Sequence, residues 1–248
     1  MPINGDTLAV GAVGDDDNGS QSGSAYIFVQ SGSSWSQQAK ITPTDTDEDD
    51  LFAASVSISG DTVAIGSPNN NGNVNISGSV YVYVRNGTTW NLQGKLIVPS
   101  ANGYDAVGAN TAIRGDVVVT ASIIPSTDDA RSNTGEVFVF SRAGTEWTYD
   151  KRILSGDLEP RDQFGRSIDI SGGTFVVGAR AEGTLGLGAG SAYVFEEYHA
   201  ELPPPPTPEP VYVPSPPSCD LGNACNDVVN NCCSRCHITY PNVIGVCV

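Results

Sequence analysis

One short segment occurs four times in the 248 residues of this chain, at nearly constant intervals. The glycine of its tight turn recurs at Gly5, Gly60, Gly115 and Gly172. These glycines are 55, 55 and 57 residues apart, and tryptophan keeps the same interval at Trp35, Trp90 and Trp147. A third marker, a glycine ahead of an alternating apolar run, recurs at Gly23, Gly78, Gly135 and Gly190. Three markers with one period indicate repeated structural units.

Each unit is expected to form four short antiparallel strands, as the second unit illustrates. Val56 and Ile58 alternate with polar residues, which is typical of a half-buried strand. Gly60 and Asp61 then form a hairpin turn, because glycine adopts positive φ without a Cβ clash. Three more strands are predicted: the second directly after this turn, the third over Ser79 to Val84, and the fourth over Trp90 to Leu96.

Sheets of this kind must bury their apolar faces against one another, and four strands per repeat are typical of propeller blades. The predicted fold class is therefore all-β, with β-propeller-type blades of four antiparallel strands and a small disulfide-rich C-terminal module. The pattern begins at a second strand and ends after a third strand, at 191–198. That predicts fourteen strands, or about three and a half repeats.

The residues at the strand ends resemble the FG-GAP repeat family of β-propellers. The resemblance is carried by Phe164-Gly165, Gly178-Ala179-Arg180, Gly66-Ser67-Pro68 and Gly11-Ala12-Val13, and it covers residues 3–197. The family includes the heads of integrin α subunits and many secreted microbial proteins. Integrin-type repeats carry a D-x-D-x-D-G calcium loop between the FG and GAP strands. This chain has only a tight turn such as SGDT there, so that calcium site does not transfer.

Acidic loops elsewhere are weaker candidates for a cation site. Asp45, Asp47 and Asp49 alternate along one loop, and Asp16 and Asn18 lie in another. Oxygen ligands at alternate positions suit calcium, but neither loop has the full spacing with a closing carboxylate. A solvated acidic loop is the favoured interpretation, and no cofactor is expected to be required.

The charge of the chain argues against two classes of partner. Acidic residues outnumber basic ones 28 to 12, which gives a formal net charge of −16. This charge repels nucleic-acid phosphates and anionic lipid. No run of eighteen apolar residues is present, so insertion into a membrane is not expected.

The domain organisation is predicted from changes in composition. Repeats at 1–200 are followed by a proline-rich linker at 201–218 and a cystine-rich module at 219–248. All six cysteines lie in this module: Cys219, Cys225, Cys232, Cys233, Cys236 and Cys247. Such a cluster in a short segment indicates a disulfide framework and an extracellular location, although the first residues lack the features of a signal peptide.

The cysteine spacing resembles the knottin family. That resemblance implies pairs Cys219–Cys233, Cys225–Cys236 and Cys232–Cys247, among fifteen connectivities that six cysteines allow. Glycosylation sequons at Asn18, Asn75 and Asn86 agree with secretion.

Several motifs have a sharper and a plainer interpretation. Cys233 to His237 matches a haem-attachment motif, but both of its cysteines are needed for an even disulfide set. Arg114-Gly115-Asp116 spells an integrin-recognition tripeptide, but it falls on the third copy of the hairpin turn. The repeated tryptophans are expected in the blade core rather than in a sugar site. Both histidines, His199 and His237, lie beyond the repeats, so no His-based catalytic site is visible in them.

These observations predict a secreted, non-enzymatic structural or adhesion protein of the cell surface or matrix. Because closed propellers have four to eight blades, the chain is expected to be either a fragment of a longer propeller or a protomer that completes its sheets with a neighbour. Exposed sheet edges favour self-association, which would suit a protomer of a glycosylated extracellular fibre. Glycans are further candidate partners. The alternative is a carbohydrate-binding protein that acts through the cystine-rich tail or the acidic loops.

Overall fold

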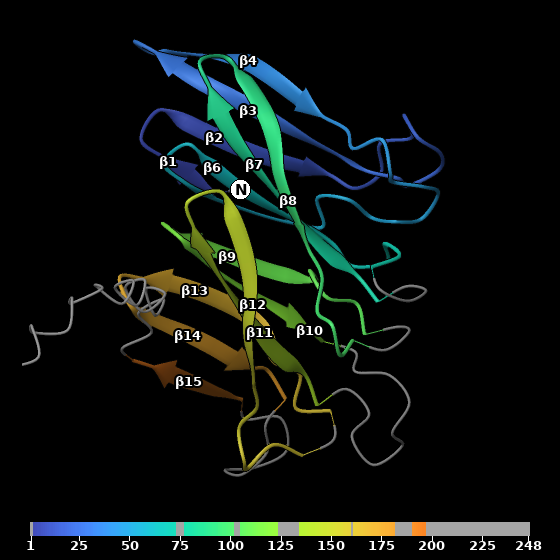
Figure 1. Ribbon diagram of the computed structural model, residues 1–248, viewed down its shortest axis with the longest axis vertical. Helices are drawn as coiled ribbons and strands as arrows, with labels where there is room; N and C mark the ends of the chain where they lie inside the picture. Colours follow the sequence, from blue (N-terminus) through green and yellow to red (C-terminus); the bar gives the residue numbers. More distant parts are fainter. Residues whose placement is uncertain are drawn as a thin grey trace, which may run out of the picture. The chain divides into compact units, whose positions relative to one another are not determined.

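The computed structural model describes residues 2–72, 77–101, 105–123, 134–159, 161–181 and 190–196. Regular secondary structure in these ranges consists of fifteen β-strands and no helix. The strands form four separate antiparallel sheets, which follow one another in chain order (Figure 1). The predicted all-β fold is confirmed for these residues, and three of the four sheets have the expected four antiparallel strands, consistent with propeller blades.

We number the sheets 1 to 4. Sheet 1 contains β1 (Ile3–Asn4), β2 (Thr7–Ala12), β3 (Ser24–Ser31) and β4 (Ser34–Ile41). Sheet 2 contains β5 (Ser55–Ser59), β6 (Thr62–Ser67), β7 (Ser79–Asn86) and β8 (Thr89–Leu96). Sheet 3 contains β9 (Asn110–Arg114), β10 (Val117–Ser122), β11 (Glu136–Ala143) and β12 (Glu146–Ile153). Sheet 4 contains β13 (Phe164–Ser171), β14 (Thr174–Ala179) and β15 (Ser191–Phe195).

The prediction that the pattern begins at a second strand is wrong. Ile3 pairs with Leu8 and Asn4 with Thr7, so a two-residue first strand precedes the first turn. The reason is the turn itself, because a two-residue hairpin loop places the residues on its two sides directly opposite each other. Strands β5 to β8 lie within two residues of their predicted positions.

The first turn of each sheet has the predicted glycine geometry. Ser59 pairs with Thr62, which leaves Gly60 and Asp61 as a two-residue loop. Gly60 has a φ of 57°, and Asp61 is not among the residues with positive φ. Positive φ at the first loop position alone is typical of the type II′ turn, whose twist matches that of the flanking strands.

Every sheet in the middle of the series buries both of its faces. We call the face toward the next sheet the forward face and the face toward the preceding sheet the rear face. On β6, Ala64 packs with sheet 3 residues such as Val118, and Val63 packs with sheet 1 residues such as Ile27. The core is therefore a set of apolar layers between consecutive sheets, with a third layer between sheets 3 and 4.

A backbone hydrogen bond joins each sheet to the next at the position of the FG sequence. The amide of Phe52 donates to the carbonyl oxygen of Ser22 at 3.0 Å. Equivalent bonds link Val107 to Ser77 at 3.0 Å and Phe164 to Thr134 at 2.8 Å.

Beside this hydrogen bond, the backbones of neighbouring sheets are in direct contact, and glycine makes the contact sterically acceptable. A Cβ placed on Gly66 would overlap the carbonyl oxygen of Gly108. The equivalent contacts are Gly11 with Ala53 and Ala121 with Gly165. Each contact has a glycine on at least one side, so the two glycines of the FG and GAP sequences serve the same junction between sheets.

We expect Gly66→Ala to lower the free energy of unfolding by about 2 kcal/mol or more, because overpacking forces the two backbones apart. Gly60→Ala is the matched control: its Cβ would meet no atom within 4 Å, so only the positive φ is penalised, by about 1 kcal/mol. Urea unfolding followed by circular dichroism measures both variants. Equal losses in the two variants would contradict the proposed role of Gly66.

Candidate functional site

The loops beside sheets 1 and 2 carry the acidic residues that sequence analysis selected. Asp15, Asp16 and Asp17 follow β2, and the residues from Asp45 to Asp50 lie between β4 and β5. These two loops are in contact, because the amide of Asp49 donates to the carbonyl oxygen of Ser20 at 2.8 Å. They form the acidic loop surface that we consider as the candidate site.

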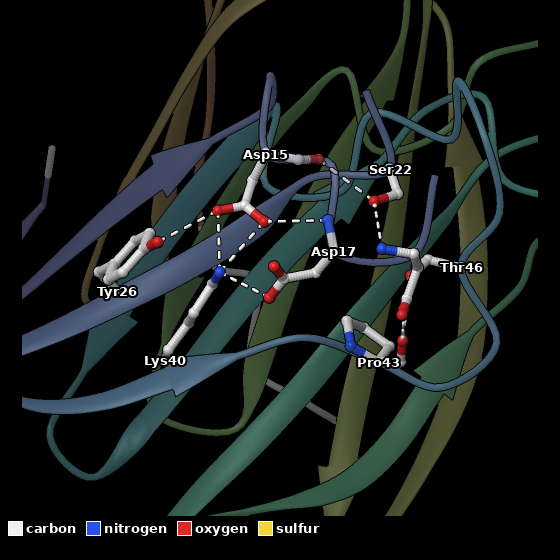
Figure 2. Close-up of polar contacts among 8 residues, drawn as sticks. Asp15, Asp17, Ser22, Tyr26, Lys40, Pro43 and Thr46 are labelled. Carbon is white, nitrogen blue, oxygen red and sulfur yellow. Dashed lines mark hydrogen bonds and ion pairs between the residues drawn. The ribbon is translucent and has the colours of Figure 1, made fainter. Parts of the chain in front are cut away.

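Lys40 on β4 is held by two carboxylates of this surface, as Figure 2 shows. Its Nζ atom lies 2.9 Å from Oδ2 of Asp15 and 2.6 Å from Oδ2 of Asp17. The hydroxyl of Tyr26 donates to Asp15 at 3.1 Å. The Lys40 ammonium also lies 5.4 Å from the centre of the Tyr26 ring, within cation–π range.

This arrangement favours the charged form of both partners. The hydrogen bond from Lys40 is the main cause that lowers the pKa of Asp15 below its ordinary value. The carboxylates of Asp17 and then Asp15 raise the pKa of Lys40. A lysine fixed as an ammonium is a poor nucleophile or base, and an ionised Asp15 cannot act as a general acid at neutral pH. The group is suited to holding the loop in place rather than to catalysis.

A second copy of this arrangement in sheet 2 supports a structural role. Lys95 occupies the position of Lys40 and lies 4.9 Å from the ring centre of Tyr81, the equivalent of Tyr26. Its Nζ atom pairs with Asp45 at 2.7 Å. In sheet 2 the acidic partner therefore comes from the loop between β4 and β5, whereas in sheet 1 it comes from the loop after β2.

The three carboxylates predicted as a weak calcium site do not converge. Asp45 is paired with Lys95, while the amide of Asp47 donates to Oδ2 of Asp50 at 2.9 Å. In Asp49, the backbone has a φ of 64° and its carbonyl oxygen accepts from Asn69. Among the residues that the structure describes, no group of three or more acidic, cysteine or histidine side chains is placed to hold a metal ion.

Sequence analysis missed a buried aspartate two residues before each FG position. Asp50 is buried, and its Oδ2 accepts from the side-chain amide of Asn70 at 2.6 Å. Asp105 and Asp162 are its buried equivalents. In the fourth repeat, Oδ2 of Asp162 accepts from the amide of Glu159 at 2.6 Å, which repeats the Asp47–Asp50 bond. The 55- and 57-residue spacing of these aspartates is the signal that could have revealed them.

The outer strands of neighbouring sheets are joined by a tryptophan and an arginine. In sheet 3, the indole nitrogen of Trp147 donates to Oε1 of Gln93 in sheet 2 at 2.9 Å. Arg142 also donates to Gln93 at 2.9 Å and lies 5.0 Å from the centre of the Trp147 ring. Trp90 and Gln38 make the same contact at 2.9 Å between sheets 1 and 2. Trp90 and Trp147 are therefore partly buried between sheets, whereas Trp35 is exposed, so the predicted place in the core does not hold for Trp35.

The integrin-recognition tripeptide lies in a hairpin turn, as its plainer interpretation predicted. Arg114 pairs with Val117 across Gly115 and Asp116. The carboxylate of Asp116 is bound by Arg142, with 2.7 Å between Nη2 and Oδ1.

Two of the three predicted glycosylation sites lie in described residues, and their environments differ. The side-chain amide of Asn18 donates to the carbonyl oxygen of Pro43 at 2.6 Å and to Oγ1 of Thr46 at 3.0 Å. Asn86 is exposed at the end of β7. Asn75 lies outside the described residues, so glycosylation stays a prediction at all three positions.

The C-terminal predictions fall outside the described residues. These are the linker at 201–218, the module at 219–248 with its six cysteines, and both histidines. The module, its disulfide pairing and the dismissal of haem stay predictions. In the part of the chain that the structure describes, no helix is long and apolar enough to cross a membrane.

Comparison with known proteins identifies one repeat family. The sequence profile described as FG-GAP repeat matches residues 2–28, 35–83 and 147–195, which together make up half of the chain. No protein of curated function matches the sequence.

Solved structures that resemble this chain include one chain of a complex and one isolated domain. One chain of an S. cerevisiae complex of a Dbp5 variant with Nup159, a Gle1 variant, IP6 and ADP is 10% identical, with a TM-score of 0.43. That alignment covers 79% of this chain and 48% of that chain. The N-terminal domain of Nup159 is 11% identical with a TM-score of 0.40, over 78% of this chain and 48% of that chain. This chain thus spans about half the length of each of these structures.

We expect the Lys40–Asp15 interaction to stabilise the fold at neutral pH and not in acid. The folded-state pKa of Asp15 is lowered, so its contribution is present above the ordinary value of 3.8 and is lost as the pH falls through the folded-state value. A double-mutant cycle of Lys40→Met and Asp15→Asn, measured by urea unfolding, should show coupling at pH 7 that declines below about pH 4. Asp16→Asn is the control and should show no coupling to Lys40. Coupling that does not change with pH would contradict this assignment.

Proposed function

Because the chain belongs to the FG-GAP repeat family, we propose that it is a secreted, non-enzymatic structural or adhesion protein of the cell surface or extracellular matrix. In this role the sheets form a scaffold that presents its loops and outer faces to other macromolecules. We further propose that it is a self-assembling protomer of an extracellular fibre.

The use of the ionisable groups in the described loops is the observation that most supports a non-enzymatic role. Lys40 and Lys95 are bound to carboxylates of the loops, and Arg85 and Arg142 are bound to the aspartates of the hairpin turns. The same contacts recur from sheet to sheet, as expected for groups that stabilise a repeat. A catalytic site would instead be a group of side chains that occurs in one repeat only and lies beside a substrate pocket.

The proposed extracellular location rests on the cysteine-rich segment and the sequons. It is also supported by the family, whose members typically occur outside cells. No cofactor is required for this function.

The two described sequons are expected to differ in glycan occupancy when the chain is produced through a eukaryotic secretory pathway. We expect higher glycan occupancy at Asn86 than at Asn18, because a glycan on Asn18 would replace at least one of the two hydrogen bonds of its amide. Mass spectrometry of peptides from the secreted protein measures both occupancies, with Asn86→Gln as the control for the assignment. Full occupancy at Asn18 with none at Asn86 would contradict this order.

Adhesion is tested with beads that carry the full chain at a single attachment point. We expect these beads to cluster with one another or to bind isolated extracellular matrix, whereas beads that carry serum albumin do neither. Absence of both kinds of binding would argue against the proposed function. Release of reducing sugars from matrix polysaccharides, abolished by one carboxylate substitution, would instead show an enzyme.

A further inference from the structure

The forward face of sheet 4 exposes apolar side chains at positions that are buried in the other sheets. Val176 and Val194 pair directly across β14 and β15, and they are 40% and 57% exposed. The residues equivalent to Val176 in sheets 1 to 3 are fully buried: Ala9, Ala64 and Val119. Those equivalent to Val194 are fully buried as well: Ile27, Val82 and Val139. The forward face of sheet 4 therefore has the apolar residues that, in sheets 1 to 3, are covered by the following sheet.

The rear face of sheet 1 is exposed in the same way. Leu8 and Phe28 pair across β2 and β3, and both are only partly buried. The residues equivalent to Leu8 are Val63, Val118 and Phe175, none more than 1% exposed. Trp35 is 38% exposed, whereas its equivalents Trp90 and Trp147 pack against the preceding sheet.

These two faces are of complementary types. In all three internal junctions, a forward face packs on a rear face with its strands in the same order along the junction. Gly178 on the forward face of sheet 4 occupies the position of Gly11 and Gly66, and the nearest atoms to an added Cβ there belong to Ser167 of its own sheet.

The charges at the loop ends of the two faces also match. Exposed Arg166 and Arg180 line a hollow on sheet 4, together with Gly178 and Ala192. Arg180 follows β14, just as Asp15 to Asp17 follow β2 in sheet 1. When two sheets pack in the manner of the internal junctions, these basic and acidic groups come to the same end and attract each other.

We infer that a second copy of this chain docks head to tail, with the rear face of its sheet 1 on the forward face of sheet 4. This inference rests on the proposed function, because it specifies how the self-assembling chain would bind its next copy. The contact is heterologous, because the two partners use different surfaces. Such contacts close into rings or extend into filaments. The described residues of two copies contain eight sheets, which is within the range of closed propellers.

The test uses one charge substitution on each face of the full-length chain. Val194→Arg blocks the forward face of sheet 4, and Leu8→Arg blocks the rear face of sheet 1. We expect each variant to weaken self-association about tenfold or more in sedimentation velocity, because an unpaired charge would be buried at the junction. The control is Leu92→Arg, which is 52% exposed on β8, away from both faces, and should associate like the unmodified chain.

Mixing the two variants distinguishes a head-to-tail contact from any symmetric one. Each variant keeps one intact face, so an equimolar mixture should form a single heterodimer and nothing larger. Self-association of Leu8→Arg at unmodified strength would show instead that sheet 4 pairs with itself, which overturns the inference. A monomeric unmodified chain at micromolar concentration also overturns it.

Two further measurements separate a failure of folding from a failure of the inference. Each variant must show the circular dichroism and urea midpoint of the unmodified chain; otherwise Val176→Arg and Trp35→Arg replace it on the same faces. Association should weaken with added salt, because Arg166, Arg180, Asp16 and Asp17 are exposed. Bead clustering that survives in both face variants would leave the proposed function standing and refute this mode of assembly.

Discussion

The structure depends on sheets that are apolar on both faces and that approach one another at backbone distance. A four-stranded sheet with two apolar faces is unstable in water by itself, so each repeat requires a neighbour on each side. At the position of Gly66 and Gly108, the two backbones are so close that side chains would hold them apart. The amide of Val107 then reaches the carbonyl oxygen of Ser77 in the preceding sheet. Gly66 and Gly108 are thus explained by packing between sheets.

Charged side chains, like the apolar ones, join neighbouring sheets. Arg142 on β11 joins Asp116, in the first hairpin turn of its own sheet, to a glutamine and a threonine of the preceding sheet. Arg85 makes the same kind of contact one repeat earlier. Because these contacts recur at the repeat interval, they are better explained by stabilisation of the repeat than by a catalytic site that occurs once.

Much of the fold could be predicted from the sequence because its signals are local. The turn at Gly60 and the alternation in β5 and β7 depend on residues a few positions apart. The buried Asp50 was missed because its role depends on Asn70, twenty residues away, although its spacing from Asp105 was visible. The pairing of Lys40 could not be predicted either. Lys95, at the equivalent position, takes its carboxylate from a different loop.

The short hairpins between neighbouring strands have a consequence for folding. Most pairings join strands adjacent in the chain, so the entropy lost in closing each loop is small and a single sheet can order before its neighbours do. Sheets 2 and 3 are each held from both sides, whereas sheet 4 has three strands in the described residues and one such neighbour. In the unassociated chain, backbone amides of β14 and β15 should accordingly exchange their hydrogens with solvent through local opening, well before the molecule unfolds as a whole.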